Sequence, residues 1–372
     1  MEGGKWKQRI TIYSFVLCLV GFTAALVILP KQAISQAERR RLAKWPELTY
    51  ETVRDESFMN DFESYLLDHF PFRDGFRRIK AEFTYKVLRQ RENNGIYVAE
   101  GHAVKLEELN VPGVQKTADK MNAVRERYFP EQKAYYAVIP DKNYFLAARN
   151  GYSAPDYGEM FGILRENMSE EAFAYIDVIS SLSIDDYYTT DTHWRQEKIW
   201  DTVTAIADSL GVGTDIGTAE RFAQNEIQDF YGVYYGQAAL ALTPDTIVYL
   251  TDDVTDSATA WNLETNRTQP VYELGKLTDE KSVDKYDIFL GGAAALQIIN
   301  SPKAATDRRL ILFRDSYASS LTPLLLGAYS EITLIDLRYI SSERIGEYVN
   351  FEDADILFLY SIAVINNGSM LK

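Results

Sequence analysis

Cysteine and histidine are both scarce in this chain. The single cysteine, Cys18, lies within a long apolar run, so the rest of the chain has neither a disulfide nor a thiol nucleophile, and zinc sites built from cysteines are excluded. The three histidines, His69, His102 and His193, form neither a His-x-His nor a His-Glu-x-x-His arrangement. A metalloenzyme therefore has little support, and we expect the protein to need no metal or cofactor.

An excess of basic residues is also lacking. The 54 acidic and 39 basic side chains give a formal net charge of −15, and such a surface repels phosphate backbones. Nucleic acid is therefore not expected as a partner. Internal repeats and low-complexity tracts are absent as well, and 372 residues that are 46% hydrophobic suffice for one large or two modest globular domains.

The N-terminus carries the one long apolar run. Lys5, Lys7 and Arg9 precede an uncharged stretch over residues 10–30. As a helix these 21 residues are about 30 Å long, which matches the hydrocarbon core of a bilayer. The basic flank is expected to stay in the cytoplasm, so that the remainder is exported. We expect an uncleaved single-pass anchor in the cell membrane. The alternative is a secreted protein whose signal peptide is cleaved at Ala33-Ile34-Ser35.

Three regions are predicted along the chain. Residues 1–30 form the cytoplasmic tip and the anchor. Residues 31–92 comprise a polar connector, which ends near Pro46, and a helical region with a break at His69-Phe70-Pro71. Residues 93–372 are expected to form an α/β domain that begins at the turn Asn93-Asn94-Gly95.

Apolar strands alternate with helices within this α/β domain. The predicted strands are 134–139, 175–179, 309–313, 332–337 and 356–360, and the predicted helices are 113–128, 156–172, 194–210 and 317–326. Continuous apolar strands separated by helices predict a mostly parallel sheet that is buried on both faces and flanked by helices. Residues 212–285 are richer in Thr, Asp, Tyr and Gly and are predicted to be a β-rich insertion.

One candidate for chemistry is Ser316, which follows the predicted strand 309–313 and precedes a helix. Ligands bind at the carboxyl ends of the strands in open α/β sheets, and the amides of a helix start can stabilise an oxyanion there. By itself this arrangement is common, and a helix-capping serine explains it better than catalysis does.

The second candidate is Asp191-Thr192-His193-Trp194, in a loop between a strand and a helix. Serine chemistry needs a base that is oriented by a third group, and a carboxylate that holds one imidazole nitrogen provides this. His193 is the one histidine with a carboxylate two residues away on a strand-to-helix loop. His69 lies among aromatic residues of the helical region and is interpreted as a packing or capping residue, and His102 as a solvated turn residue.

A resemblance supports combining these candidates. Residues 188–194 (YTTDTHW) resemble the signature of the DHHW protein family, which is similar to alginate O-acetylation proteins whose catalytic domains resemble SGNH hydrolases. Seven further short matches follow the family order: residues 42–46, 62–65, 68–74, 94–97, 289–292, 315–318 and 366–367. The resemblance implies an SGNH hydrolase-like α/β fold for residues 93–372.

What the resemblance implies for the site is a catalytic set of Asp191 as orienting group, His193 as general base and Ser316 as nucleophile. Arg314, Tyr317 and Trp194 flank this set and are expected to bind substrate or to support the catalytic residues. One departure concerns the segment after Gly291-Gly292. The family pattern usually has an asparagine there, a side-chain donor to the oxyanion, whereas this chain has Ala293. Losing one such donor typically lowers a rate by ~10²–10³.

Two classes of function follow. The first is an O-acetyltransferase, or the related acetylesterase, that acts on an extracytoplasmic polysaccharide and receives acyl groups from a multi-pass membrane-bound O-acyltransferase. The second is a non-catalytic protein that binds glycan or serves as a scaffold in such a complex. Ala293 favours the second class, and the presence of Asp191, His193 and Ser316 together favours the first.

Overall fold

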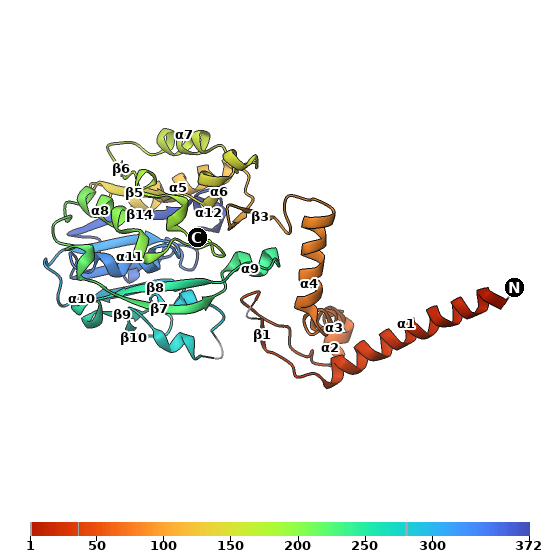
Figure 1. Ribbon diagram of the computed structural model, residues 1–372. Helices are drawn as coiled ribbons and strands as arrows, with labels where there is room; N and C mark the ends of the chain where they lie inside the picture. Colours follow the sequence, from red (N-terminus) through yellow and green to blue (C-terminus); the bar gives the residue numbers. More distant parts are fainter. Residues whose placement is uncertain (1, 36, 280–281) are drawn as a thin grey trace. The chain divides into compact units, whose positions relative to one another are not determined.

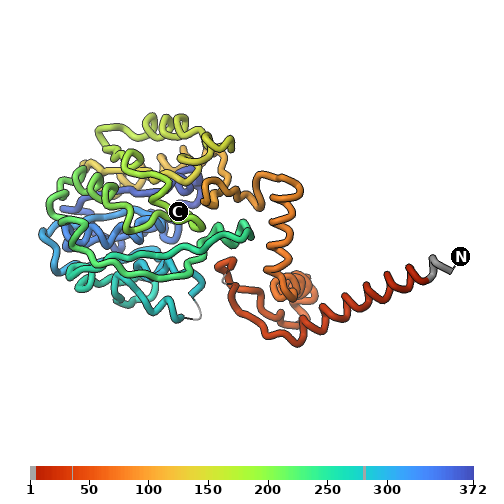
Figure 2. Tube along the Cα trace, in the orientation of Figure 1, coloured from red at the N-terminus to blue at the C-terminus, as the bar shows by residue number. Residues whose placement is uncertain are grey.

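The computed structural model describes residues 2–35, 37–279 and 282–372 (Figures 1 and 2). They form two compact units. Residues Met1–Asn93 and Tyr235–Ala241 make up the N-terminal unit, and residues Asn94–Tyr234 and Leu242–Lys372 make up the α/β unit.

The N-terminal unit begins with the long helix α1 (Glu2–Ile28). Its segment Trp6–Ile28 is long and apolar enough to cross a membrane, and none of it is buried within the protein. A signal sequence and a single membrane anchor both have this form. The remaining elements are β1 (Ile34–Ser35), β2 (Arg40–Arg41), α2 (Tyr50–Arg54), α3 (Ser57–Asp68), α4 (Arg73–Glu82) and the π-helical turn η1 (Phe83–Val87). The predicted break falls between α3 and α4.

An eight-stranded sheet forms the centre of the α/β unit (Figure 1). Its order is β10-β9-β11-β13-β12-β14-β5-β6. The strands are β5 (Ala134–Ile139), β6 (Phe173–Tyr175), β9 (Thr259–Asn262), β10 (Arg267–Pro270), β11 (Leu296–Asn300), β12 (Arg309–Arg314), β13 (Glu331–Ile335) and β14 (Ala354–Ser361). The four pairs from β13 to β6 are parallel and the three from β10 to β13 are antiparallel. The predicted α/β fold with a mostly parallel sheet is confirmed.

Strand β14, near the C-terminus, lies beside β5, more than two hundred residues earlier, as the blue and yellow segments of Figure 2 show. Helices flank this sheet (Figure 1). They are α5 (Val111–Tyr128), α6 (Lys142–Leu146), α7 (Tyr157–Asn167), α8 (Trp200–Ser209), α10 (Asp253–Ser257), α11 (Ala318–Leu325) and α12 (Ile362–Ile365). Two hairpin pairs lie outside the sheet: β3 (Ile96–Ala99) with β4 (His102–Lys105), and β7 (Ala223–Phe230) with β8 (Asp245–Thr251).

Side chains of the central strands alternate between two hydrophobic cores. Along β12, Leu310 and Leu312 belong to one core with residues of α8 and α11, whereas Ile311 and Phe313 belong to the other with residues of α5 and α7. Because successive side chains of a strand point to opposite faces, a continuous apolar run is what a sheet covered on both sides requires. This is why the apolar runs of the sequence located the central strands well.

The boundaries differ from prediction in several places. Helix α8 begins at Trp200 instead of residue 194, and α7 ends at Asn167 instead of residue 172. The predicted strand 175–179 is wrong except at Tyr175, because β6 is Phe173–Tyr175. Beyond it, the Asp177 carboxylate accepts hydrogen bonds from the amides of Ile179 and Ser180 and turns the chain. Residues 212–285 do contain strands, but only β7 and β8 form a separate sheet. Strands β9 and β10 extend the central sheet through antiparallel pairing with β11.

Candidate active site

Two loops at the carboxyl edge of the sheet carry the predicted site residues. Ser316 lies in the turn between β12 and α11, directly beyond the end of the strand. Asp191 and His193 lie in the loop that leads to α8. This loop reaches the same edge, because Lys142, just after β5, donates a hydrogen bond to the Tyr188 carbonyl (2.9 Å).

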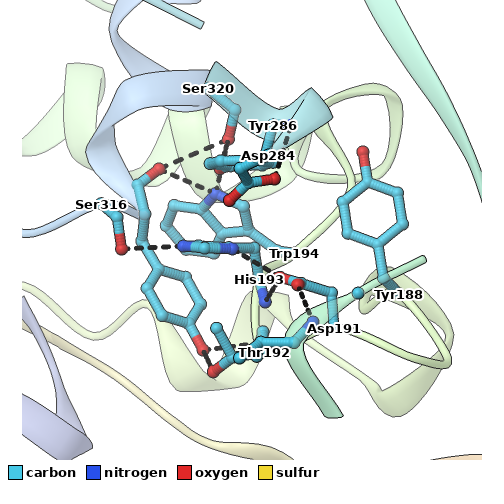
Figure 3. A network of polar contacts seen from close by, with 12 residues as sticks. Tyr188, Asp191, Thr192, His193, Trp194, Asp284, Tyr286, Ser316 and Ser320 are labelled. Carbon is cyan, nitrogen blue, oxygen red and sulfur yellow. Dashed lines mark hydrogen bonds and ion pairs between the residues drawn. The ribbon is translucent and has the colours of Figure 1, made fainter. Parts of the chain in front are cut away.

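The loops bring a hydroxyl, an imidazole and a carboxylate into one line (Figure 3). Ser316 Oγ lies 2.7 Å from His193 Nε2. On the other side of the ring, Asp191 Oδ1 lies 2.6 Å from His193 Nδ1. Both distances are within hydrogen-bond reach of a nucleophile–base and a base–orienter pair. With the proton on Nδ1, Nε2 is free to accept the Ser316 hydroxyl proton.

Burial increases from Ser316 through His193 to Asp191, the three residues that we call the relay. Ser316 is partly exposed, His193 is 6% exposed and Asp191 is fully buried. The hydroxyl is therefore accessible to a substrate, whereas the ion pair that would form behind it is shielded from water. Electrostatic interactions are stronger in such surroundings.

Aromatic rings fix the plane of the imidazole. Tyr286 stacks on His193 with ring centroids 4.0 Å apart and planes within 8°. Tyr317 approaches the same ring at 4.9 Å. Tyr286 is itself held by Ser320, whose Oγ is 2.9 Å from its hydroxyl. The imidazole is thus oriented by packing as well as by Asp191.

Further hydrogen bonds join the two loops on either side of the relay. The Tyr317 hydroxyl donates to the Thr192 carbonyl (2.6 Å). The indole N–H of Trp194 donates to the Tyr317 carbonyl (3.1 Å) and to Ser320 Oγ (3.0 Å). Trp194 is fully buried and Tyr317 nearly so. Both residues therefore hold the two loops together.

The turn that carries Ser316 is anchored by Asp315. Its carboxylate accepts from the Tyr317 amide (3.0 Å) and from the Ser361 amide at the end of β14 (2.7 Å). The amides of Ala318 and Ser319 donate to the carbonyls of Asp315 and Ser316. These helix-start amides are engaged within the turn, contrary to the expectation that they are presented to an oxyanion.

Arg314 is buried beneath this turn rather than exposed to a substrate. Its guanidinium donates to Ser319 Oγ (3.1 Å) and to Gln297 Oε1 (3.3 Å), and Gln297 in turn donates to the Leu290 carbonyl (2.7 Å). Burial lowers the pKa of Arg314 from its usual value, and Asp336 opposes this effect. Arg314 therefore has a supporting position.

Two residues that the sequence did not indicate hold the loop before Asp191. The Asp245 carboxylate accepts four hydrogen bonds, from the amides and hydroxyls of Thr189 and Thr190, at 2.5–2.8 Å. Lys142 Nζ donates to the carbonyls of Tyr188 (2.9 Å) and Thr189 (3.2 Å). Burial lowers the pKa of Lys142 to about 7, and the charges of Asp191 and Asp245 oppose this. Asp245 thus accepts hydrogen bonds from this loop, and Lys142 donates hydrogen bonds to it.

The position of Asp191 also depends on a close approach of a distant segment. The Val233 amide donates to Asp191 Oδ2 (2.8 Å), and the Gly232 amide donates to Thr190 Oγ1 (2.9 Å). A Cβ atom on Gly232 would lie 2.3 Å from the Thr190 carbonyl oxygen. Only glycine allows the backbone to come this near.

The segment after Gly291-Gly292 supplies no polar side chain, since Ala293, Ala294 and Ala295 follow. Gly292 has φ of +95°, a conformation that glycine adopts readily. Ala294 and Ala295 are buried, and the Ala295 amide donates to Glu264 Oε2 (3.2 Å).

The other two histidines have local partners. His69 Nε2 lies 2.9 Å from the Ala43 carbonyl oxygen, in the N-terminal unit. His102 was expected to be a solvated turn residue, which is wrong: it begins β4 and is buried, with Nδ1 3.3 Å from the Glu100 carbonyl oxygen. Within the described residues, no group of three His, Cys, Asp or Glu side chains is placed to hold a metal ion.

Comparison with known proteins finds a family model that matches part of the chain. The family model of the DHHW protein matches residues 159–335, which include Asp191, His193 and Ser316. This region, just under half of the chain, resembles the DHHW protein family. No curated protein matches it.

Solved structures share the fold of this chain. A DHHW family protein from Eubacterium siraeum is 18% identical, with a TM-score of 0.58 over 74% of this chain and 95% of that chain. Bacillus cereus PatB1 with a sulfonyl adduct is 15% identical, with a TM-score of 0.56 over 74% of this chain and 96% of that chain. The O-acetyltransferase domain of Pseudomonas putida AlgJ is 11% identical over 73% of this chain and 92% of that chain, with a TM-score of 0.42. At these identities the first two show a common fold alone, and the third carries no argument.

Proposed function

We propose that this protein is a serine-dependent O-acetyltransferase that acts on an extracytoplasmic polysaccharide, with Ser316 as nucleophile, His193 as general base and Asp191 as orienting carboxylate. One observation carries the proposal: Ser316 Oγ, both nitrogens of His193 and Asp191 Oδ1 form a continuous line of contacts of 2.6–2.7 Å, with the hydroxyl at the accessible end.

In the first half-reaction, His193 Nε2 takes the Ser316 proton while Oγ attacks the carbonyl carbon of an acyl donor. The resulting tetrahedral oxyanion collapses, the leaving group takes the proton from the imidazolium, and an acyl-serine remains. Asp191 stabilises the positive imidazolium through Nδ1. Since both groups are buried, this interaction is little weakened by water.

In the second half-reaction, a sugar hydroxyl enters in place of the leaving group. Nε2 removes its proton, the oxygen attacks the acyl-serine, and Ser316 recovers its proton as the sugar ester departs. Water in the acceptor position gives acetate instead, so acetylesterase activity is the same chemistry with another acceptor.

The proposed location of this chemistry is outside the cytoplasm. The segment Trp6–Ile28, with Lys5, Lys7 and Arg9 at its N-terminal end, would anchor the chain in the cell membrane. An anchored enzyme can receive acyl groups from a membrane-bound O-acyltransferase that moves them across the bilayer, and this is the partner we propose. A secreted form cleaved near residue 35 is the alternative.

A second candidate is a non-catalytic glycan-binding or scaffolding protein. Ala293 favours it, because this position supplies no side-chain donor to an oxyanion. Under this reading the relay is present but the acyl intermediate is not stabilised enough to form.

Acetate release from p-nitrophenyl acetate by the full chain in detergent micelles separates the two candidates. We expect slow release that is lost in Ser316→Ala and His193→Ala. Ser209→Ala is a matched control, since the Ser209 hydroxyl is exposed and donates to the Ala205 carbonyl of its own helix. An identical rate in the wild type and both relay variants would select the binding protein. Transfer of an acetyl group to an oligosaccharide, followed by mass spectrometry, then separates transferase from esterase.

A further inference from the structure

An exposed apolar stripe runs along one side of α4 and η1 in the N-terminal unit. Its members share an outward position at helical spacing and are Phe72, Phe76, Ile79, Phe83 and Val87. Their exposed fractions are 70%, 46%, 66%, 51% and 61%. Steps of three and four residues place side chains on one side of a helix. Large apolar side chains in a contiguous exposed row mark an interaction surface.

The opposite side of the same helix is the one that contacts the protein. Ala81 and Thr84 are buried, and the Arg77 guanidinium donates to the Gly236 carbonyl within the N-terminal unit. Arg77 also lies 3.3 Å from the Glu38 carboxylate. The exposed apolar stripe therefore faces away from the unit's own interior, and packing within the unit does not explain it.

The charge of this segment differs from that of the whole chain. Residues 73–91 contain seven basic side chains, Arg73, Arg77, Arg78, Lys80, Lys86, Arg89 and Arg91, and two acidic ones, Asp74 and Glu82. The segment therefore carries a formal charge of +5 in a chain whose net charge is −15. A helix with an apolar face and flanking Lys and Arg has the composition of one that lies in the interface of an anionic bilayer.

Ring contacts connect this stripe to the membrane-spanning segment. Phe22, in α1, stacks on Phe70 with centroids 5.2 Å apart and contacts Phe76 of the stripe at 6.0 Å. Phe22 precedes the end of α1 by six residues, about 9 Å of helix rise. An interfacial helix buries its apolar face by ~5–10 Å. The start of the stripe thus lies at the depth that such a helix occupies.

We propose that residues 73–87 form an interfacial helix whose exposed apolar stripe inserts into the outer surface of an anionic bilayer beside α1. The contact with Phe22 and the positive charge favour lipid over a protein partner or a second copy. The inference rests on the anchor part of the proposed function and not on the relay. Its role would be to hold the exported chain at the membrane surface by two elements rather than one.

Site-directed spin labels on the full chain test this inference. In a Cys18→Ser background, with one copy per phosphatidylcholine–phosphatidylglycerol nanodisc, single cysteines replace Phe76, Ile79 or Phe83. Matched control labels replace Asp74 or Arg78 on the polar flanks of the same helix. We expect the ratio of oxygen to nickel-complex accessibility to be on the order of tenfold higher at the three stripe positions, because oxygen dissolves in the acyl region and the nickel complex does not.

Equal ratios at stripe and control positions would overturn the proposal. The proposal would also be overturned if the stripe labels were shielded from both reagents only when two copies share a disc. That result would identify a second copy as the partner of the exposed apolar stripe. Acetate release measured on the same labelled proteins reports on Ser316 independently, so failure of the interfacial helix and failure of the catalytic proposal are distinguishable.

Discussion

Replacing Asp191 by asparagine tests the relay with the smallest change of shape. One carboxylate oxygen of Asp191 faces His193 Nδ1 (2.6 Å) and also accepts from the His193 amide (3.1 Å). The other accepts from the Val233 amide (2.8 Å). Asparagine retains one acceptor but puts an NH₂ group in place of the second oxygen.

Either orientation of the asparagine has a cost. With its NH₂ toward His193, Nδ1 must accept, the ring proton moves to Nε2, and Nε2 can no longer take the Ser316 proton. With its NH₂ toward Val233, two donors face each other in the interior, which costs about 1–3 kcal/mol of stability. In Ser-His-Asp enzymes the wrong tautomer lowers kcat by ~10⁴, or about 5.4 kcal/mol. We therefore expect acetate release to fall by about 10³–10⁴.

The assay is steady-state acetate release from p-nitrophenyl acetate, combined with thermal unfolding of each protein. Asp252→Asn is the matched control. Asp252 caps α10 and pairs with Arg221 (2.9 Å), in the α/β unit but away from the relay. We expect its kcat to equal that of the wild type. Retention of more than about a tenth of the wild-type kcat in Asp191→Asn would refute an orienting role for the carboxylate.

Three further predictions concern the surroundings of the relay. Burial lowers the pKa of Lys142 to about 7, against ~10.4 in an unfolded chain, so between these values the unfolded chain holds a proton that the folded chain has lost. The free energy of unfolding should then rise with pH by up to ~1.4 kcal/mol per pH unit in that window. Urea unfolding at pH about 8 and 9 should show this rise in the wild type and not in Lys142→Met. The same pH dependence in both proteins would contradict the prediction. Asp245→Ala leaves the amides of Thr189 and Thr190 without their acceptor, so it should destabilise the protein by about 2–4 kcal/mol. It should also lower kcat with KM unchanged. Asp245→Asn, measured alongside it, should lose less stability and less kcat. Dialysis against EDTA should leave acetate release unchanged, and a loss restored by a divalent metal would argue against the serine relay.

The sequence allowed the central strands and the relay residues to be predicted, for two different reasons. Strands β5, β12 and β14 are buried on both faces, and a continuous apolar run is a strong local signal for such a strand. Asp191 and His193 are two residues apart in one loop, so their pairing is also local. The convergence of Ser316 with them followed from a family resemblance and from the rule that strand ends share one edge.

The residues that hold the relay in place could not be predicted in this way. Tyr286, Lys142 and Asp245 act through contacts with loops far away in the sequence, and each is of a type that is common elsewhere in the chain. For Lys142 a weak signal existed, because it follows the end of β5 at the edge where ligands bind. The pairing of β9 and β10 with β11 likewise depends on tertiary contacts that short, partly polar strands do not encode locally.

The central claim is that Ser316 is an activated nucleophile, and covalent labelling tests it most directly. A sulfonyl fluoride is a suitable reagent, because an activated serine hydroxyl attacks its sulfur, expels fluoride and keeps the sulfonyl group. We predict that the wild type gains one sulfonyl group, mapped by peptide mass spectrometry to Ser316, that His193→Ala reacts far more slowly, and that Ser316→Ala does not react. Labelling of a different residue, or an equal rate of labelling in His193→Ala, would contradict the account.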